Sequence, residues 1–159
     1  MKKMLVVLVA VLCFTSSAFA EPWRVFDNTG LFGEGREIIE HTIFNFQRET
    51  NCDFVILTMD DYFGENVHSD IVNTFYHSNN FGVGTKSNGF VYYFTLYNGL
   101  YSPRFQYYGE LSDILTDEKC DEIWALCSSF LDKGDVIGSA LSLIESVTEA
   151  VTTYKNGVV

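Results

Sequence analysis

Hydrophobic positions along the first half of the chain predict a helix, a strand and a second helix. Apolar side chains recur three and four positions apart over residues 31–50, which is the spacing of an amphipathic helix. A similar spacing runs over residues 67–79. Between these segments, residues 54–59 (FVILTM) form a short apolar run, typical of a strand that is buried on both faces. We therefore expect this strand at the centre of a sheet.

The pattern then predicts a β-hairpin. The segments Gly89–Tyr97 (GFVYYFTLY) and Leu100–Tyr108 are rich in aromatic residues, and Asn98-Gly99 between them is a strong signal for a type I′ turn. The two strands are therefore expected to pair antiparallel. Pro103 cannot donate a hydrogen bond to a neighbouring strand, so we expect the second strand at an edge of the sheet or with a bulge.

Two more helices are predicted after the hairpin, over residues 116–131 and 135–154, with Thr116 and Asp135 as their N-caps. The chain shows no internal repeat, linker or low-complexity segment. This order of elements predicts an α/β fold: a three-layer α/β/α sandwich around a small mixed sheet that includes one antiparallel hairpin.

The first twenty residues have the pattern of a secretory signal peptide. Lys2 and Lys3 form a basic start, an apolar run covers residues 4–14, and Ala18-Phe19-Ala20 is a small-x-small cleavage signature. The run is too short to indicate a membrane span. We therefore expect cleavage after Ala20 and one mature domain over residues 21–159, located in the periplasm or secreted, with no stable membrane span. The alternative is a lipoprotein anchored at Cys13, but Leu12 stands where a small residue is needed.

The net charge of the chain narrows the class of partner. The whole chain carries a net charge of −11, and removal of residues 1–20 leaves 8 basic and 21 acidic residues. Such a balance argues against nucleic acid or an anionic membrane surface as a partner, because both need a cationic footprint.

Cys120 and Cys127 are too far apart on one helix to form a disulfide. Cys52 could pair with either of them, or all three could be buried as small hydrophobic residues.

Five short motifs in the same order resemble the TPM domain family, which includes thylakoid-lumen acid phosphatase-like proteins of photosystem II repair and secreted bacterial proteins of the YgcG type. The resemblance covers nearly the whole expected mature chain. It rests on residues 25–31 (VFDNTGL), 52–58 (CDFVILT), 81–91 (FGVGTKSNGFV), 115–117 (LTD) and 130–135 (FLDKGD). The resemblance implies an α/β domain and, for some members, a weak metal-assisted acid phosphatase activity.

Two departures from the family pattern bear on that activity. Ser87 stands where the family usually has Asp before Asn-Gly, and residues 108–112 (YGELS) scramble a run in which the family has Gly-Leu-Glu. The usual carboxylates at both places are candidates for metal or phosphate chemistry. Their change in this chain weighs against the phosphatase activity that the resemblance implies.

Oxygen-bearing side chains at the ends of predicted elements are the candidate metal ligands. Asp27, Asp60, Asn88 and Asp117 could together supply the hard oxygen ligands that Ca²⁺ or Mg²⁺ prefers. With the neutral Ser87 beside them, binding is expected to be weak. Each residue also has a plainer structural interpretation: Asp27 as the cap of a turn, Asp60 as a solvated strand end, Asn88 as part of a turn, and Asp117 in a first helical turn.

Two functions of different classes follow. The first is a non-catalytic module that binds an envelope or extracellular protein, a divalent cation (Ca²⁺) weakly, or both. It fits the acidic charge, the single domain and the absence of a nucleophile motif. The second is the metal-assisted phosphatase that the resemblance implies. That chemistry needs positioned cations around the transferring phosphoryl group, and the chain offers only Lys86 in the relevant loop.

Overall fold

The computed structural model describes residues 23–60, 65–97 and 99–157. The expected signal peptide with Cys13, and Asn98 of the predicted turn, lie outside these residues. In chain order, the elements are β1 (Val25–Asp27), the 3₁₀ helix η1 (Gly33–Gly35), α2 (Arg36–Thr50), β2 (Asp53–Met59), α3 (Glu65–Ser78), β3 (Gly89–Tyr97), β4 (Leu100–Tyr108), α4 (Leu111–Ile114), α5 (Asp117–Leu131) and α6 (Val136–Lys155).

The four strands form one mixed sheet in the order β1-β2-β3-β4. Strand β2 pairs in parallel with β1 and with β3, whereas β3 and β4 form an antiparallel hairpin. The prediction of a central strand over residues 54–59 is therefore confirmed, and so is the antiparallel pairing of the hairpin. Pro103 lies on β4, at an edge of this sheet, where its missing N–H costs no bond between the described strands.

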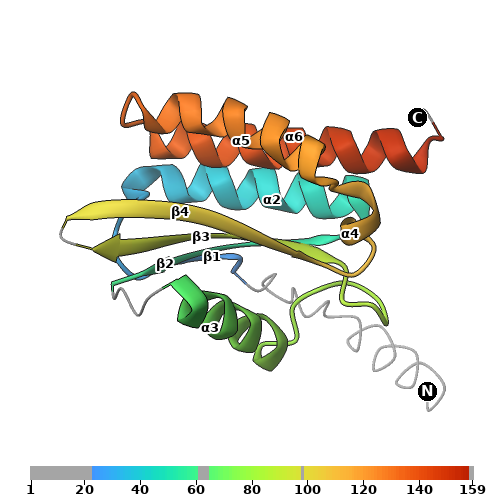
Figure 1. The fold of residues 1–159 in the computed structure, drawn as a ribbon, viewed down its shortest axis with the longest axis horizontal. Coiled ribbons are helices and arrows are strands. Elements are labelled where there is room, and N and C mark those ends of the chain that lie inside the picture. Colours follow the sequence, from blue (N-terminus) through green and yellow to red (C-terminus); the bar gives the residue numbers. More distant parts are fainter. Residues whose placement is uncertain (1–22, 61–64, 98, 158–159) are drawn as a thin grey trace, which may run out of the picture.

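Helices cover both faces of the sheet, which confirms the predicted α/β/α arrangement of layers. Helices α2, α5 and α6 lie on one side and α3 lies on the other (Figure 1). Alternate side chains of β2 divide accordingly: Phe54 and Ile56 belong to the larger core under α2 and α6, while Val55 and Leu57 pack with Val72 of α3. Burial on both faces explains why residues 54–57 of this strand are all apolar.

The aromatic residues of the hairpin are buried unequally. On β3, Tyr92, Tyr93 and Phe94 are buried on alternating faces, whereas the β4 residues Phe105 and Tyr107 are half-buried. Strand β3 has neighbours on both sides, and β4 has one neighbour in the sheet. The position of each strand in the sheet therefore decides how far its aromatic side chains are exposed.

The structure differs from the prediction at three short segments. Strand β1 has only three residues, too few to show an alternating pattern, and pairing with β2 defines it. The first helix begins at Arg36 rather than residue 31, because the chain first passes through the η1 turn with Gly33 at a φ of 48°. Helix α4 is a single turn that no periodicity could indicate.

Candidate functional site

The carboxyl end of β1 is organised by the carboxylate of Asp27. This residue lies opposite Thr58 of β2. Its Oδ1 accepts hydrogen bonds from the Leu31 N–H at 2.9 Å and from the Thr58 hydroxyl at 3.0 Å, and its Oδ2 accepts one from the Phe32 N–H at 2.8 Å. The carboxylate therefore holds the turn that leads into η1 and fastens it to β2.

Hydrogen bonding keeps Asp27 ionised. Burial by itself would raise the pKa of this carboxyl, but the hydrogen bonds from Phe32, Leu31, Thr58 and Thr29 outweigh it and lower the pKa below its usual value. Near neutral pH the group is a fixed anion with no proton to donate. Its capping of a turn is the plainer of the two interpretations considered for this residue, and the geometry supports it.

Neutral oxygens surround Asp27 at this end of the sheet. The Thr29 N–H donates to the Thr58 hydroxyl at 3.1 Å, and the Asn28 side chain donates to the Thr58 carbonyl at 3.3 Å. From β4, the hydroxyl of Tyr101 donates to the Thr29 hydroxyl at 3.3 Å. A hydrogen-bonded cluster thus connects β1, β2 and β4 at one end of the sheet.

Asp60 lies near this cluster, one residue past the end of β2 and two past Thr58. Its side chain is exposed to solvent. Because β1 and β2 run in parallel, Asp27 and Asp60 are at the same end of the sheet, as expected for residues that follow parallel strands. This is where α/β proteins usually bind ligands.

Asn88 is at the opposite end of the sheet. It precedes β3, and its carbonyl accepts a hydrogen bond from the N–H of Asp53, the first residue of β2. The seven residues of β2 span about 20 Å, which separates Asn88 from Asp60. The Asn88 side chain accepts a hydrogen bond from the Glu110 N–H at 2.9 Å.

Asp117 also lies away from Asp27. It occupies the first turn of α5, after the N-cap Thr116, whose side chain accepts from the Lys119 N–H. It follows β4 and α4, and the last residue of β4 pairs with the first residue of β3, next to Asn88. The four predicted ligands are therefore divided into two pairs at opposite ends of the sheet, and the structure does not bring them together. Metal binding by either pair stays a prediction.

The two departures from the family pattern meet in space beside Asn88. Ser87 has a φ of 53°, and the neighbouring Lys86 forms an exposed ion pair with Glu110 at 3.6 Å. Gly109 has a φ of 68°, and an added Cβ would lie 2.1 Å from the Asn88 side-chain oxygen. Glycine is therefore required where the two segments approach each other. Both departures change the same place in the fold.

A buried carboxylate that the motif analysis did not single out is Asp53. It is 1% exposed, and its oxygens accept hydrogen bonds from Arg24 Nε at 2.6 Å, Gln47 Nε2 at 2.7 Å and the Gly82 N–H at 2.9 Å. The signal in the sequence was an acidic residue directly before the apolar run of β2. These donors come from three segments, so Asp53 fastens the amino end of the sheet together.

The three cysteines of the described chain are free thiols. Burial is the largest influence on Cys52, Cys120 and Cys127, and it raises the pKa of each thiol above its usual value. The thiol form therefore prevails at neutral pH, which makes each a poor nucleophile. None of the three forms a disulfide, and Cys52 and Cys127 are buried as expected of small hydrophobic residues, whereas Cys120 is half-buried.

The described ranges contain neither a metal-ligand cluster nor a helix that could span a membrane. Nowhere in these ranges do three or more His, Cys, Asp or Glu side chains lie where they could share a metal ion. No described helix combines the length and the apolar character that a bilayer crossing requires.

Two solved structures have the same fold as this chain. The BA42 protein of Bizionia argentinensis aligns with a TM-score of 0.62 at 14% identity, covering 76% of this chain and 81% of that protein. The N-terminal domain of cg2496 from Corynebacterium glutamicum aligns with a TM-score of 0.55 at 20% identity, covering 85% and 83%. At these identities, the likeness shows the fold alone.

Sequence comparison identifies the family. No curated protein matches the chain. The sequence profile of the TPM domain matches residues 25–150, from β1 into the last turns of α6. This range contains the whole sheet, the Asp27 cluster and the helices of both layers apart from the last five residues of α6, 151–155. The match covers well over half of the chain and agrees with the fold, and the protein therefore belongs to the TPM domain family.

Proposed function

We propose that this TPM domain is a non-catalytic binding module that is exported by its signal peptide and bound by a partner protein in the envelope or outside the cell. The observation that carries the proposal is the state of Asp27. Both of its oxygens accept hydrogen bonds within the fold, and its pKa is lowered despite the opposing effect of burial. A carboxylate in this state stabilises a turn and cannot serve as a general acid near neutral pH.

A hydrolysis assay tests the non-catalytic character. The purified protein is expected to hydrolyse p-nitrophenyl phosphate no faster than buffer alone, with or without Ca²⁺ or Mg²⁺. Asp60→Asn is the informative variant, because Asp60 is exposed and its replacement leaves the fold intact. Metal-dependent turnover that Asp60→Asn lowers would establish the metal-assisted phosphatase instead.

Weak calcium binding at the carboxyl ends of β1 and β2 is part of the same proposal. Asp60 offers an exposed carboxylate there, beside the Asp27 cluster. With one exposed carboxylate, affinity near the millimolar end of extracellular sites is expected. For a dissociation constant of about 1 mM, 10 mM Ca²⁺ stabilises the native state by about 1.4 kcal/mol. The melting temperature should therefore rise by about 5 °C.

Two matched variants locate the cation. Asp60→Asn should abolish most of the calcium-induced rise in melting temperature, whereas Asp117→Asn should retain it, because Asp117 lies toward the other end of the sheet. Both residues are exposed, so both variants should fold like the wild type. The reverse pattern would place the cation beside Asn88, and no rise in the wild type would remove calcium from the proposal.

A further inference from the structure

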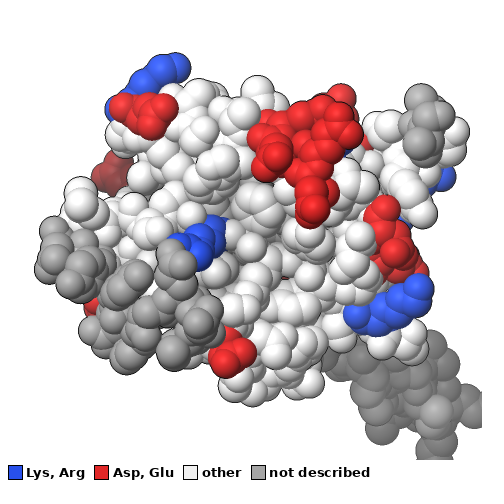
Figure 2. Space-filling view, in the orientation of Figure 1, with Lys and Arg blue, Asp and Glu red and all other residues white. Residues whose placement is uncertain are grey.

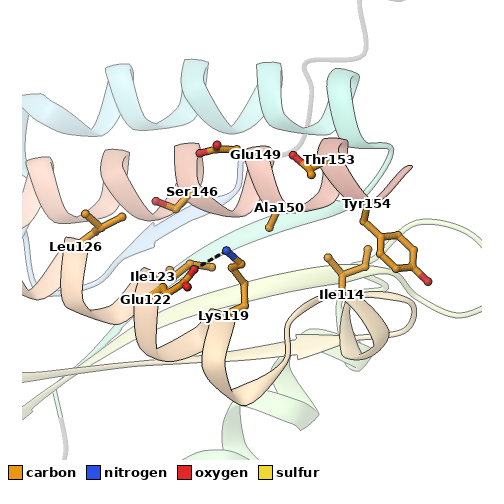
Figure 3. Close-up of a pocket in the computed structure, with 10 residues that line it drawn as sticks. All are labelled: Ile114, Lys119, Glu122, Ile123, Leu126, Ser146, Glu149, Ala150, Thr153 and Tyr154. Atoms are coloured by element: carbon orange, nitrogen blue, oxygen red, sulfur yellow. Dashed lines mark hydrogen bonds and ion pairs between the residues drawn. The ribbon is translucent and has the colours of Figure 1, made fainter. Parts of the chain in front are cut away.

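Helices α5 and α6 form a groove on the outer surface of the helical layer. The groove has a volume of about 520 Å³. Its apolar ends are Leu126 on one side and Tyr154 with Ile114 on the other, as Figure 3 shows. Leu126 is 55% exposed and Tyr154 48% exposed, which are large values for side chains of this size. The fold thus leaves two large apolar side chains uncovered in one groove.

Carboxylates line the middle of the groove and its borders. Glu122 and Glu149 line it directly, and Lys119 between them forms an ion pair with Glu122. Glu118 is exposed on α5 as well. Figure 2 shows acidic side chains gathered over α5. The single lysine leaves a net negative charge around the apolar ends.

The groove has the length of a short helical segment. Ser146 lines the groove with Leu126 at one end and Tyr154 lies at the other, eight residues further along α6. Eight residues of a helix rise about 12 Å. Apolar side chains seven or eight positions apart on another helix would therefore reach both ends, and basic residues beside them would face the glutamates.

The neighbouring groove between α2 and α6 makes a useful contrast. It is lined mainly by polar side chains, among them Asn45, Glu49 and Thr148. Neither Leu126 nor Tyr154 reaches it. Two grooves of one helical layer thus differ in apolar exposure although both carry glutamates.

We propose that the groove between α5 and α6 binds a basic amphipathic helix of the partner protein. The inference rests on the proposed binding function and names the chemistry of the partner. Charge decides the occupant: a second copy of this acidic chain would be repelled, whereas lysines or arginines would be attracted. Leucine-like side chains of the partner would cover Leu126 and Tyr154.

A synthetic peptide tests the groove on the intact protein. The probe is an 18-residue helix of leucine and lysine, with leucines at positions i, i+3, i+4 and i+7, and its control is a scrambled peptide of the same composition. We expect the amphipathic peptide to bind at least tenfold more tightly than the scrambled one, and more weakly as salt screens the charges. NMR shifts should concentrate on α5 and α6.

Three single variants locate the binding. Leu126→Gln and Glu122→Lys should each weaken binding by about tenfold, a change of about 1.4 kcal/mol. Glu49→Lys makes the same charge change in the neighbouring groove and should alter binding less than twofold. All three residues are exposed, so the variants should fold.

Several outcomes would overturn the inference. Equal binding of the scrambled peptide would show that charge attraction alone accounts for the affinity. If the amphipathic peptide does not bind, the groove does not bind a basic amphipathic helix. Loss of peptide binding in Glu49→Lys alone would place the binding site in the groove between α2 and α6. Self-association of the free protein that Leu126→Gln abolishes would make a second copy the occupant. None of these results would imply catalysis, which the hydrolysis assay decides separately.

Discussion

Replacing Asp53 with alanine is expected to lower the free energy of unfolding by about 3–5 kcal/mol, the usual cost of breaking a buried ion pair from one side. The carboxylate is 1% exposed and lies 2.6 Å from Arg24 Nε. Its removal leaves the Gln47 amide and the Gly82 N–H without their acceptor as well. Urea unfolding followed by circular dichroism measures the loss.

An exposed ion pair serves as the control for Asp53→Ala. Lys86 and Glu110 lie 3.6 Å apart with side chains 63% and 46% exposed. Exposed pairs of this kind contribute about 0–1 kcal/mol, so Glu110→Ala should change stability little. A loss below about 1 kcal/mol in Asp53→Ala would mean that water or other groups replace the carboxylate, contrary to the role assigned to it.

The central part of the fold could be predicted because its signals are local and strong. Residues 54–59 form an apolar run interrupted only by Thr58, which is typical of a strand covered on both faces. Asn98-Gly99 between two aromatic segments specifies a hairpin. Strand β1 could not be predicted, because three residues carry no periodicity and pairing with β2 alone defines it.

The arrangement of the candidate ligands was harder to predict for a physical reason. Asp60 follows a strand and Asn88 precedes one, so their separation depends on whether β2 and β3 run in the same direction. The parallel register, with Asp53 opposite Gly89, places them at opposite ends. An antiparallel pair would have brought them to one end. Element ends were predictable from the sequence, whereas strand direction is a property of the whole sheet.

The buried role of Asp53 shows a second limit of sequence patterns. A charged residue beside an apolar run can lie in solvent or be buried with partners, and the pattern is the same in both cases. Its donors Arg24, Gln47 and Gly82 come from segments up to 29 residues away. Only the folding of the residue before β1, of α2 and of the loop before β3 around the start of β2 makes them neighbours.

Asp27→Asn is expected to lower the free energy of unfolding at pH 7 by about 2–3 kcal/mol, since hydrogen bonds to a charged acceptor contribute about 1.5–3 kcal/mol. An asparagine has one acceptor oxygen in place of two. If that oxygen accepts from Leu31 and Thr58, the asparagine NH₂ faces the Phe32 N–H, and two donors then oppose each other. Asp60→Asn is the matched control and should change stability by less than about 0.5 kcal/mol.

The dependence of this loss on pH distinguishes the ionised carboxylate from a packing effect. The pKa of Asp27 is lower in the folded protein than in the unfolded chain, so its contribution is complete above the unfolded value of about 3.9 and disappears as the pH falls through the folded value. The difference in unfolding free energy between wild type and Asp27→Asn should therefore be constant from pH 7 to pH 5 and should shrink below pH 4. Urea unfolding at each pH measures it. A difference that stays the same at low pH would show that the variant disturbs packing, and that the charge of Asp27 does not hold the turn.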